Sequence, residues 1–217
     1  MEKYSDFDSK LIKKENTNYE LFYIQKLIIE ELFEMILHTI NDKNVHIDKI
    51  LEPSCGSSHI IQYIDHYFPN INIDAIEYDF NVFRELNKNN NLKNKNNVNI
   101  INGDFINFDF DVLYDLIIIT NLYNIACKKE HTLKAPRGYV LDKMNIFGLY
   151  IIHALTMLKN GGILVYLIPK SFLNSFCYIK INKYIKEICE IVEIIDFDSE
   201  NKLKDKQGIY AIILYKL

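Results

Sequence analysis

The sequence predicts a doubly wound α/β sheet that is mostly parallel and carries an antiparallel hairpin at its C-terminal end. Short apolar segments of strand length alternate with longer segments whose apolar residues recur at helical spacing. The last two strand-like segments, 191–197 and 209–217, are joined by a charged stretch too short for a crossover helix. Polar residues also follow several predicted strands directly, as expected where parallel strands end at one edge of a sheet.

The elements follow in a regular order along the chain. Strands are predicted at 47–51, 71–76, 98–101, 115–120, 163–168, 191–197 and 209–217. Helices are predicted at 19–40, from the turn at 54–58 to Phe68, at 82–86, at 145–159 and at 178–189. We expect Asn160-Gly161-Gly162 to end the fourth of these helices. The stretch 87–97, nearly all Asn and Lys, is expected to be a solvated loop.

Length and composition predict one domain. The 217 residues, 49% of them hydrophobic, suffice for one α/β core, with residues 1–44 as a tail and packing helix and 45–217 as the domain proper. The net charge of -4 provides no global attraction for nucleic acid. The four cysteines lack C-x-x-C spacing, the histidines lack metal-ligand spacing, and the apolar runs are too short to span a membrane. We therefore expect a soluble intracellular protein without a metal site.

The stretch 48–61 is the most informative part of the chain. It reads as a strand that ends at Glu52, a turn containing Gly56, and an amphipathic helix. Such a turn lets a ligand lie against bare backbone near the positive end of a helix, with a carboxylate beside it. Taken alone it could equally be an ordinary strand-to-helix turn. However, Glu77, Asp104 and Asn121 follow the next three predicted strands in the same way, and such groups gather where ligands bind.

Four segments carry motifs, and together they resemble a known family. They are Leu-Glu-Pro-Ser-Cys-Gly-Ser (51–57), Ile-Glu-Tyr-Asp (76–79), Gly-Asp-Phe (103–105) and 158–173, which contains Lys-Asn-Gly-Gly and Ile-Pro-Lys. The chain from about residue 47 to Leu217 resembles the catalytic domain of S-adenosylmethionine-dependent DNA adenine methyltransferases of the restriction-modification type. This resemblance implies a seven-stranded Rossmann-like sheet. Asn-Ile-Phe-Gly-Leu-Tyr (145–150) is also similar to the segment that packs beside the methyl donor.

The resemblance implies S-adenosylmethionine as the cofactor and gives roles to the residues at the strand ends. Glu52 and the following turn would hold the methionine end, Glu77 would accept both ribose hydroxyls, and Asp104 would accept from the adenine amine. Tyr78 and Phe105 would flank the adenine ring. Taken singly, these side chains could be a solvated carboxylate and ordinary core aromatics. The predicted cofactor-binding residues are Glu52, Pro53, Cys55, Gly56, Glu77, Tyr78, Asp104 and Phe105.

The predicted catalytic segment departs from the family. Members carry Asn-Pro-Pro-Tyr, in which two oxygens accept from the target amine and the aromatic stacks on the flipped base. This chain has Thr120-Asn121-Leu122-Tyr123. An ungapped alignment replaces the family's Asn by Thr120, whereas a shift by one residue restores Asn121 but puts Asn124 at the aromatic position. Leu122 cannot restrict the backbone as proline does, so we expect impaired catalysis.

The predicted substrate is DNA, with an amine or amide in RNA or protein as a variant. Family members read DNA sequence through a recognition domain, which we do not find before Leu217, so we expect a separate recognition subunit. The oligomeric state is open. Substrate contacts are assigned to the loop 125–143, which could also be merely a solvated loop, and to the segment 145–150. The residues assigned are Lys128, Lys134, Arg137 and Phe147.

Two classes of function follow. The first is an enzyme that methylates the exocyclic amine of adenine. The second is a catalytically inactive methyltransferase-like subunit that binds cofactor or a partner and acts as a scaffold. We favour the first because the cofactor motifs are well kept. Activity on DNA and RNA would discriminate between the two classes.

Overall fold

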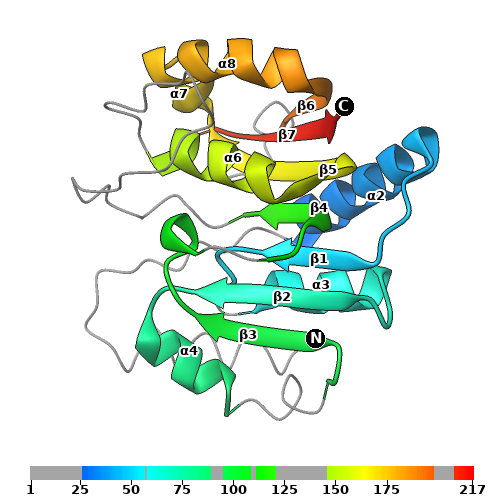
Figure 1. Cartoon of the computed structure of the whole chain (residues 1–217), viewed down its shortest axis with the longest axis vertical. Coiled ribbons are helices and arrows are strands. Elements are labelled where there is room, and N and C mark those ends of the chain that lie inside the picture. Colours follow the sequence, from blue (N-terminus) through cyan, green and yellow to red (C-terminus); the bar gives the residue numbers. More distant parts are fainter. Residues whose placement is uncertain (1–25, 57, 89–94, 109–110, 121–145, 198–207) are drawn as a thin grey trace.

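The computed structural model describes residues 26–56, 58–88, 95–108, 111–120, 146–197 and 208–217. Within these residues, seven strands form one sheet in the order β3-β2-β1-β4-β5-β7-β6 (Figure 1). The strands are β1 (Lys49–Glu52), β2 (Asn72–Glu77), β3 (Val98–Asn102), β4 (Tyr114–Ile119), β5 (Leu158–Pro169), β6 (Cys189–Asp196) and β7 (Ile209–Lys216).

The strand pairing confirms the predicted fold class. β1 is parallel to β2 and β4, β2 is parallel to β3, and β4 is parallel to β5. β7 is antiparallel to both β5 and β6, as predicted for the C-terminal hairpin. The chain proceeds from β1 outward to β3 and then crosses back to β4 on the other side of β1. This switch point between β1 and β4 is where ligands bind in sheets of this kind.

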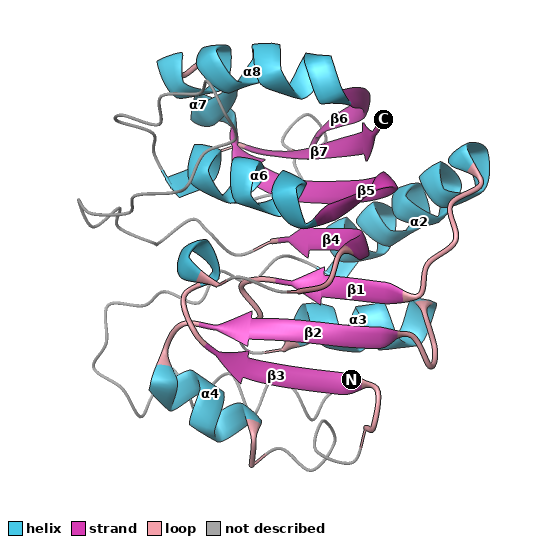
Figure 2. Cartoon of the chain, viewed as in Figure 1, coloured by secondary structure: helices cyan, strands magenta, loops and turns pink. Residues whose placement is uncertain are grey.

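Helices cover both faces of the sheet. Figure 2 shows α3 behind the sheet and α6 in front of it. The rear cluster contains Leu32, Phe33, Ile36, Ile60 and Ile64 on helices and Ile50, Ile73 and Leu116 on strands. The front cluster includes Leu149, Ile152, Ile181 and Ile185 on helices and Leu51, Ile117 and Leu164 on strands. The helices are α2 (Lys26–Lys43), α3 (His59–Tyr67), α4 (Phe80–Leu86), α6 (Ile146–Met157), α7 (Lys170–Leu173) and α8 (Phe176–Ile188), with a short 3-10 turn η1 (Phe105–Asn107).

Residues 160–162 differ from the prediction, because they lie inside β5 and do not end a helix. α6 ends at Met157, and β5 begins with Leu158, which pairs with Tyr114. The regular register resumes at Ile163, opposite Leu116. Gly161 has φ 79°, and a Cβ on Gly162 would lie 3.0 Å from the carbonyl oxygen of Asp115. Gly161 therefore allows the irregular backbone at the start of β5, and Gly162 allows the close approach to β4. Both features depend on the pairing with β4, which is distant in the sequence.

Several other bounds also shift. Asp79 caps α4, and its Oδ1 accepts from Asn81 N at 2.7 Å, so this helix starts two residues earlier than predicted. The helix predicted from residue 19 is described from Lys26 to Lys43. η1 and α7 were not predicted. The tail before residue 26 and the loop 125–143 lie outside the described residues, and the domain boundary near residue 44 stays a prediction.

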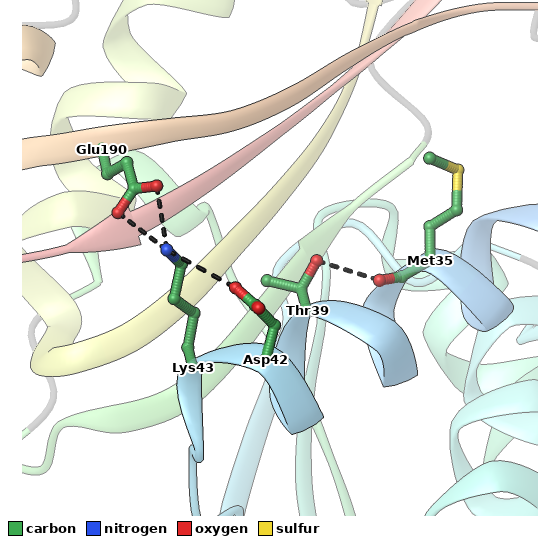
Figure 3. A network of polar contacts seen from close by, with 5 residues as sticks. All are labelled: Met35, Thr39, Asp42, Lys43 and Glu190. Carbon is green, nitrogen blue, oxygen red and sulfur yellow. Dashed lines mark hydrogen bonds and ion pairs between the residues drawn. The ribbon is translucent and has the colours of Figure 1, made fainter.

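An ion pair attaches the end of α2 to β6, an edge strand of the sheet. Lys43 Nζ lies 2.9 Å from both carboxylate oxygens of Glu190 in β6 and 3.6 Å from Asp42 (Figure 3). The hydrogen bond to Glu190 raises the pKa of Lys43. One turn earlier in α2, Thr39 Oγ1 donates to the carbonyl of Met35. Because the Lys43–Glu190 pair is exposed, it fixes the position of α2 more than it stabilises the fold.

A second polar cluster joins four neighbouring strands. The Asp74 carboxylate in β2 accepts from the Tyr114 hydroxyl at 2.8 Å and from Asn99 at 2.9 Å, and it forms an ion pair with Lys49 at 2.9 Å. Burial by itself would raise the pKa of Asp74, but these partners together lower it. The cluster connects β1, β2, β3 and the start of β4. Among the described helices, none is long and apolar enough to cross a membrane.

Candidate functional site

Glu52, the last residue of β1, is the most unusual side chain of the site. Its side chain is completely buried, and among the described residues neither carboxylate oxygen has a hydrogen-bond partner. Burial raises the pKa of Glu52 well above its ordinary value, and the nearby charge of Glu77 raises it further. A buried carboxyl group without a partner is costly for a folded protein. Its position at the switch point therefore suits a group that binds a cationic ligand.

The turn after Glu52 brings backbone N–H groups to the carboxyl end of β2. Cys55 N donates to Ile76 O at 3.0 Å, which holds the turn against β2. Gly56 has φ 49°, a conformation that glycine adopts without steric cost. Ser58, which precedes α3, makes no side-chain capping bond. The hydroxyls of Ser54 and Ser58 are buried and have no hydrogen-bond partner among the described residues.

Glu77 ends β2 and is held by the turn. Its Oε2 accepts from Gly56 N at 2.8 Å and its Oε1 accepts from Asp79 N at 2.7 Å. Burial raises the pKa of Glu77, and these two backbone hydrogen bonds offset only part of that effect. Each carboxylate oxygen has a further lone pair. Glu77 is thus fixed in orientation and still able to accept from a ligand hydroxyl.

Asp104 lies two residues beyond β3 and is tied to the end of β2. Gly103 N and Asn102 Nδ2 both donate to the carbonyl of Glu77, at 3.0 and 2.8 Å. The Asp104 carboxylate caps η1 by accepting from Ile106 N at 3.1 Å and from Asn107 Nδ2 at 2.9 Å. The structure therefore brings together the ends of β1, β2 and β3, where the sequence predicted a cofactor.

The two predicted aromatic walls differ in their surroundings. Tyr78 is 61% exposed, whereas Phe105 is 1% exposed. The ring of Phe105 packs against Tyr150 and His153 of α6, with ring centroids 4.9 and 4.7 Å apart. Phe105 thus forms part of the front core, and its role beside an adenine ring stays a prediction.

Tyr150 and His153 were not singled out from the sequence as site residues. Burial raises the pKa of the Tyr150 hydroxyl, and the charges of Asp104 and Glu77 raise it further. α6 is apolar on almost every face. The hydrophobic pattern of the sequence therefore gave no signal for which of its residues face the strand ends.

The predicted catalytic segment is described only at its first residue. Thr120 follows β4 and is fully buried, and its hydroxyl has no hydrogen-bond partner among the described residues. Asn121, Leu122 and Tyr123 lie outside the described residues, as do Lys128, Lys134 and Arg137. Phe147 in α6 packs with Phe172 and Tyr166, at 5.5 and 6.4 Å between ring centroids. Catalytic and substrate roles for these residues stay predictions.

The chain is similar in sequence to modification methylases. It is 29% identical over 188 residues to modification methylase CviBIII of Paramecium bursaria Chlorella virus NC1A, covering 83% of this chain and 46% of that protein. It is 29% identical over 184 residues to the type II methyltransferase M.AccI of Acinetobacter calcoaceticus, covering 79% and 33%. The chain thus spans half or less of the length of these relatives. No family model matches the chain.

Solved structures share the fold. A protein from Listeria monocytogenes assigned to the class I S-adenosylmethionine-dependent methyltransferases has a TM-score of 0.60 at 18% identity, covering 86% of this chain and 59% of that one. A further S-adenosylmethionine-dependent methyltransferase, from Clostridium acetobutylicum, has a TM-score of 0.59 at 15% identity, covering 99% and 98%. The N-methyltransferase NodS of Bradyrhizobium japonicum, in complex with S-adenosylhomocysteine, has a TM-score of 0.54 at 14% identity, covering 86% of each chain. The chain is thus similar in sequence to type II modification methyltransferases and has the Rossmann-like fold seen in S-adenosylmethionine-dependent methyltransferases.

Proposed function

We propose that the chain binds S-adenosylmethionine at the carboxyl ends of β1, β2 and β3 and transfers a methyl group to the exocyclic amine of adenine in DNA. The observation that carries the proposal is the completely buried carboxyl group of Glu52, which has no hydrogen-bond partner in the part of the chain that the structure describes. An ammonium group is the natural partner for such a carboxylate. The names of the sequence relatives, a modification methylase and a type II methyltransferase, support methyl transfer.

Three carboxylates would each bind a different part of the cofactor. Glu52 would accept from the methionine ammonium group, and Glu77, already oriented by Gly56 N and Asp79 N, would accept from the ribose hydroxyls. Asp104 would accept from the amine of the cofactor adenine. When bound, the cofactor supplies a methyl group on a positively charged sulfur. The chain's own contribution is to hold that group at the switch point, beside the end of β4.

Replacement of Glu77 by Ala should weaken cofactor binding. The variant loses a charged acceptor for two hydroxyls, and we expect the Kd for S-adenosylhomocysteine to rise about 10- to 100-fold. Isothermal titration calorimetry measures this change. Glu34→Gln, on the exposed side of α2, is the matched control and should bind like the wild type. Absence of heat and of a thermal shift with the wild type at millimolar ligand would refute the cofactor proposal.

The substrate is tested by transfer of a tritiated methyl group to mixed DNA and RNA. We expect incorporation at adenine in DNA, with weak and nonspecific binding by the chain alone, because its net charge is -4. Salt should therefore abolish the binding, and specificity would come from a separate recognition subunit. Incorporation into RNA alone would reassign the substrate. Sub-micromolar, sequence-specific DNA binding by the chain at physiological salt would contradict the separate subunit.

A catalytically inactive scaffold is the second candidate function. It is favoured by Thr120-Asn121-Leu122, which stands where the family has Asn-Pro-Pro. Loss of one of two acceptors for the target amine should cost about 3 kcal/mol, or about a hundredfold in rate. If the chain is an enzyme with impaired catalysis and not a scaffold, its low turnover should therefore rise when these residues are replaced by Asn-Pro-Pro.

The replacement is assayed by methyl incorporation into single-stranded or mismatched adenine substrates, in which base flipping costs least. Tyr123 stays in place in the variant. If both proteins bind cofactor tightly but transfer no methyl group, the scaffold function is correct. Vigorous wild-type turnover that the replacement destroys would show that this segment has a working geometry of its own.

A further inference from the structure

His153 of α6 holds the far end of the turn that carries Asp104. Its Nε2 lies 2.9 Å from the carbonyl oxygen of Phe108, so the protonated Nε2 donates to this acceptor. Its ring also meets the ring of Phe105 edge-on, at 4.7 Å and 65°. Tyr150, one helical turn earlier, packs on the same Phe105 ring at 4.9 Å. α6 thus contacts both the middle and the end of the turn after β3.

The turn from Gly103 to Phe108 is a closed unit. Asp104 caps it at the start through Ile106 N, and Phe108 N donates to Phe105 O at 3.1 Å. The Phe108 ring folds back over Gly103, since a Cβ added to Gly103 would lie 2.7 Å from Phe108 Cε2. Phe108 thus contacts His153 through its carbonyl oxygen and Gly103, the residue directly before Asp104, through its ring.

We infer that His153 is a positioning residue that sets the location of the Asp104 carboxylate and, through it, the preference for an adenine ring in the cofactor. The inference rests on the proposed function, in which Asp104 accepts from the adenine amine. His153 would act from the side of the turn opposite the cap, and it need not touch the ligand. Phe105, which directly follows Asp104 and contacts the rings of both Tyr150 and His153, transmits the constraint to Asp104.

The inference is tested with two ligands that differ only at the adenine amine. S-adenosylhomocysteine carries this amine, and its 6-deamino analogue, the purine riboside, has a hydrogen atom in its place and cannot donate a hydrogen bond to the carboxylate from this position. The wild type should prefer the first ligand by about 10- to 100-fold, the value of one hydrogen bond to a charged acceptor. His153→Leu should reduce this ratio by about tenfold or more, chiefly through weaker binding of the adenine ligand.

Conservative and double variants separate positioning from a general loss of structure. His153→Gln keeps an N–H donor of similar reach and should restore the preference. In Asp104→Ala, which removes the acceptor, the preference should already be lost, and adding His153→Leu should change the ratio no further. His66→Leu, on the exposed side of α3, is the control and should behave as the wild type. Thermal melts show which variants are folded, and His153→Asn, too short to reach Phe108 O, replaces His153→Leu if the latter is unfolded.

The outcomes are distinguishable. A folded His153→Leu or His153→Asn protein that keeps the full preference for the adenine ligand overturns the role of His153. An additive loss in the double variant also overturns it, because His153 would then act independently of Asp104. If the wild type binds neither ligand, the proposed function itself fails.

Discussion

At the scale of single residues, Glu52 lowers the stability of the ligand-free chain and is at the same time the group that would bind the ligand. Its carboxyl group is buried without a partner among the described residues, and burial raises its pKa. A carboxyl group whose pKa is raised in the folded state contributes its full stability below the ordinary pKa of about 4.3 and loses it as the pH rises through the folded value. The folded ligand-free chain is therefore penalised at neutral pH.

Glu52→Gln, nearly identical in shape but uncharged, should remove this penalty. We expect the free energy of unfolding of the ligand-free protein to rise at pH 7, because the Gln amide cannot ionise in this buried position. The gain should shrink toward pH 4, and the variant should bind cofactor poorly. Urea unfolding at both pH values measures it. Equal stability of the two proteins at neutral pH would show that Glu52 is satisfied in the ligand-free state.

At the scale of elements, the cluster around Asp74 stabilises the contact between β2 and the start of β4. Tyr114→Phe removes the donor that lies 2.8 Å from the buried Asp74 carboxylate. We expect a loss of about 1–3 kcal/mol in the free energy of unfolding, measured by urea titration. Tyr67→Phe, whose ring stacks on Phe33 at 4.9 Å, is the control and should change little. A Tyr114→Phe protein as stable as the control would contradict this role.

The same cluster predicts an acid-dependent loss of stability. Burial alone would raise the pKa of Asp74, but Lys49, Asn99 and Tyr114 lower it overall. A lowered pKa means that the contribution is complete above the ordinary value of about 3.9 and is lost as the pH falls through the folded value. Asp74→Asn should therefore flatten the stability profile below about pH 4. An unchanged slope of unfolding free energy against pH would contradict this assignment.

The elements show where sequence patterns suffice and where they do not. All seven strands were predicted within the described residues, because short apolar runs bounded by polar turns are a local signal. The start of β5 at Leu158 was missed, since only the pairing with Tyr114 makes residues 158–162 part of a strand. The 3-10 turn η1 was missed for a different reason, because its three residues are too few to show a hydrophobic period.

At the scale of the whole molecule, the strand order assembles the candidate site. Glu52, Glu77 and Asp104 were predictable because parallel strands end at one edge, so residues that end strands must gather there. His153 was not, because its contacts with Phe105 and Phe108 depend on how α6 packs across the sheet. The burial of the Thr120 hydroxyl, which has no hydrogen-bond partner within the described ranges, was likewise visible only in the fold.

The measurement that tests the central claim most directly is a crystal structure of the chain with S-adenosylhomocysteine. The account predicts the ligand ammonium within about 2.7–2.9 Å of a Glu52 oxygen and the ribose hydroxyls on the Glu77 carboxylate. It also predicts that these two side chains keep their present places, because backbone N–H groups already hold Glu77. A ligand bound away from the ends of β1 and β2, or one that leaves Glu52 without a partner, would contradict the account.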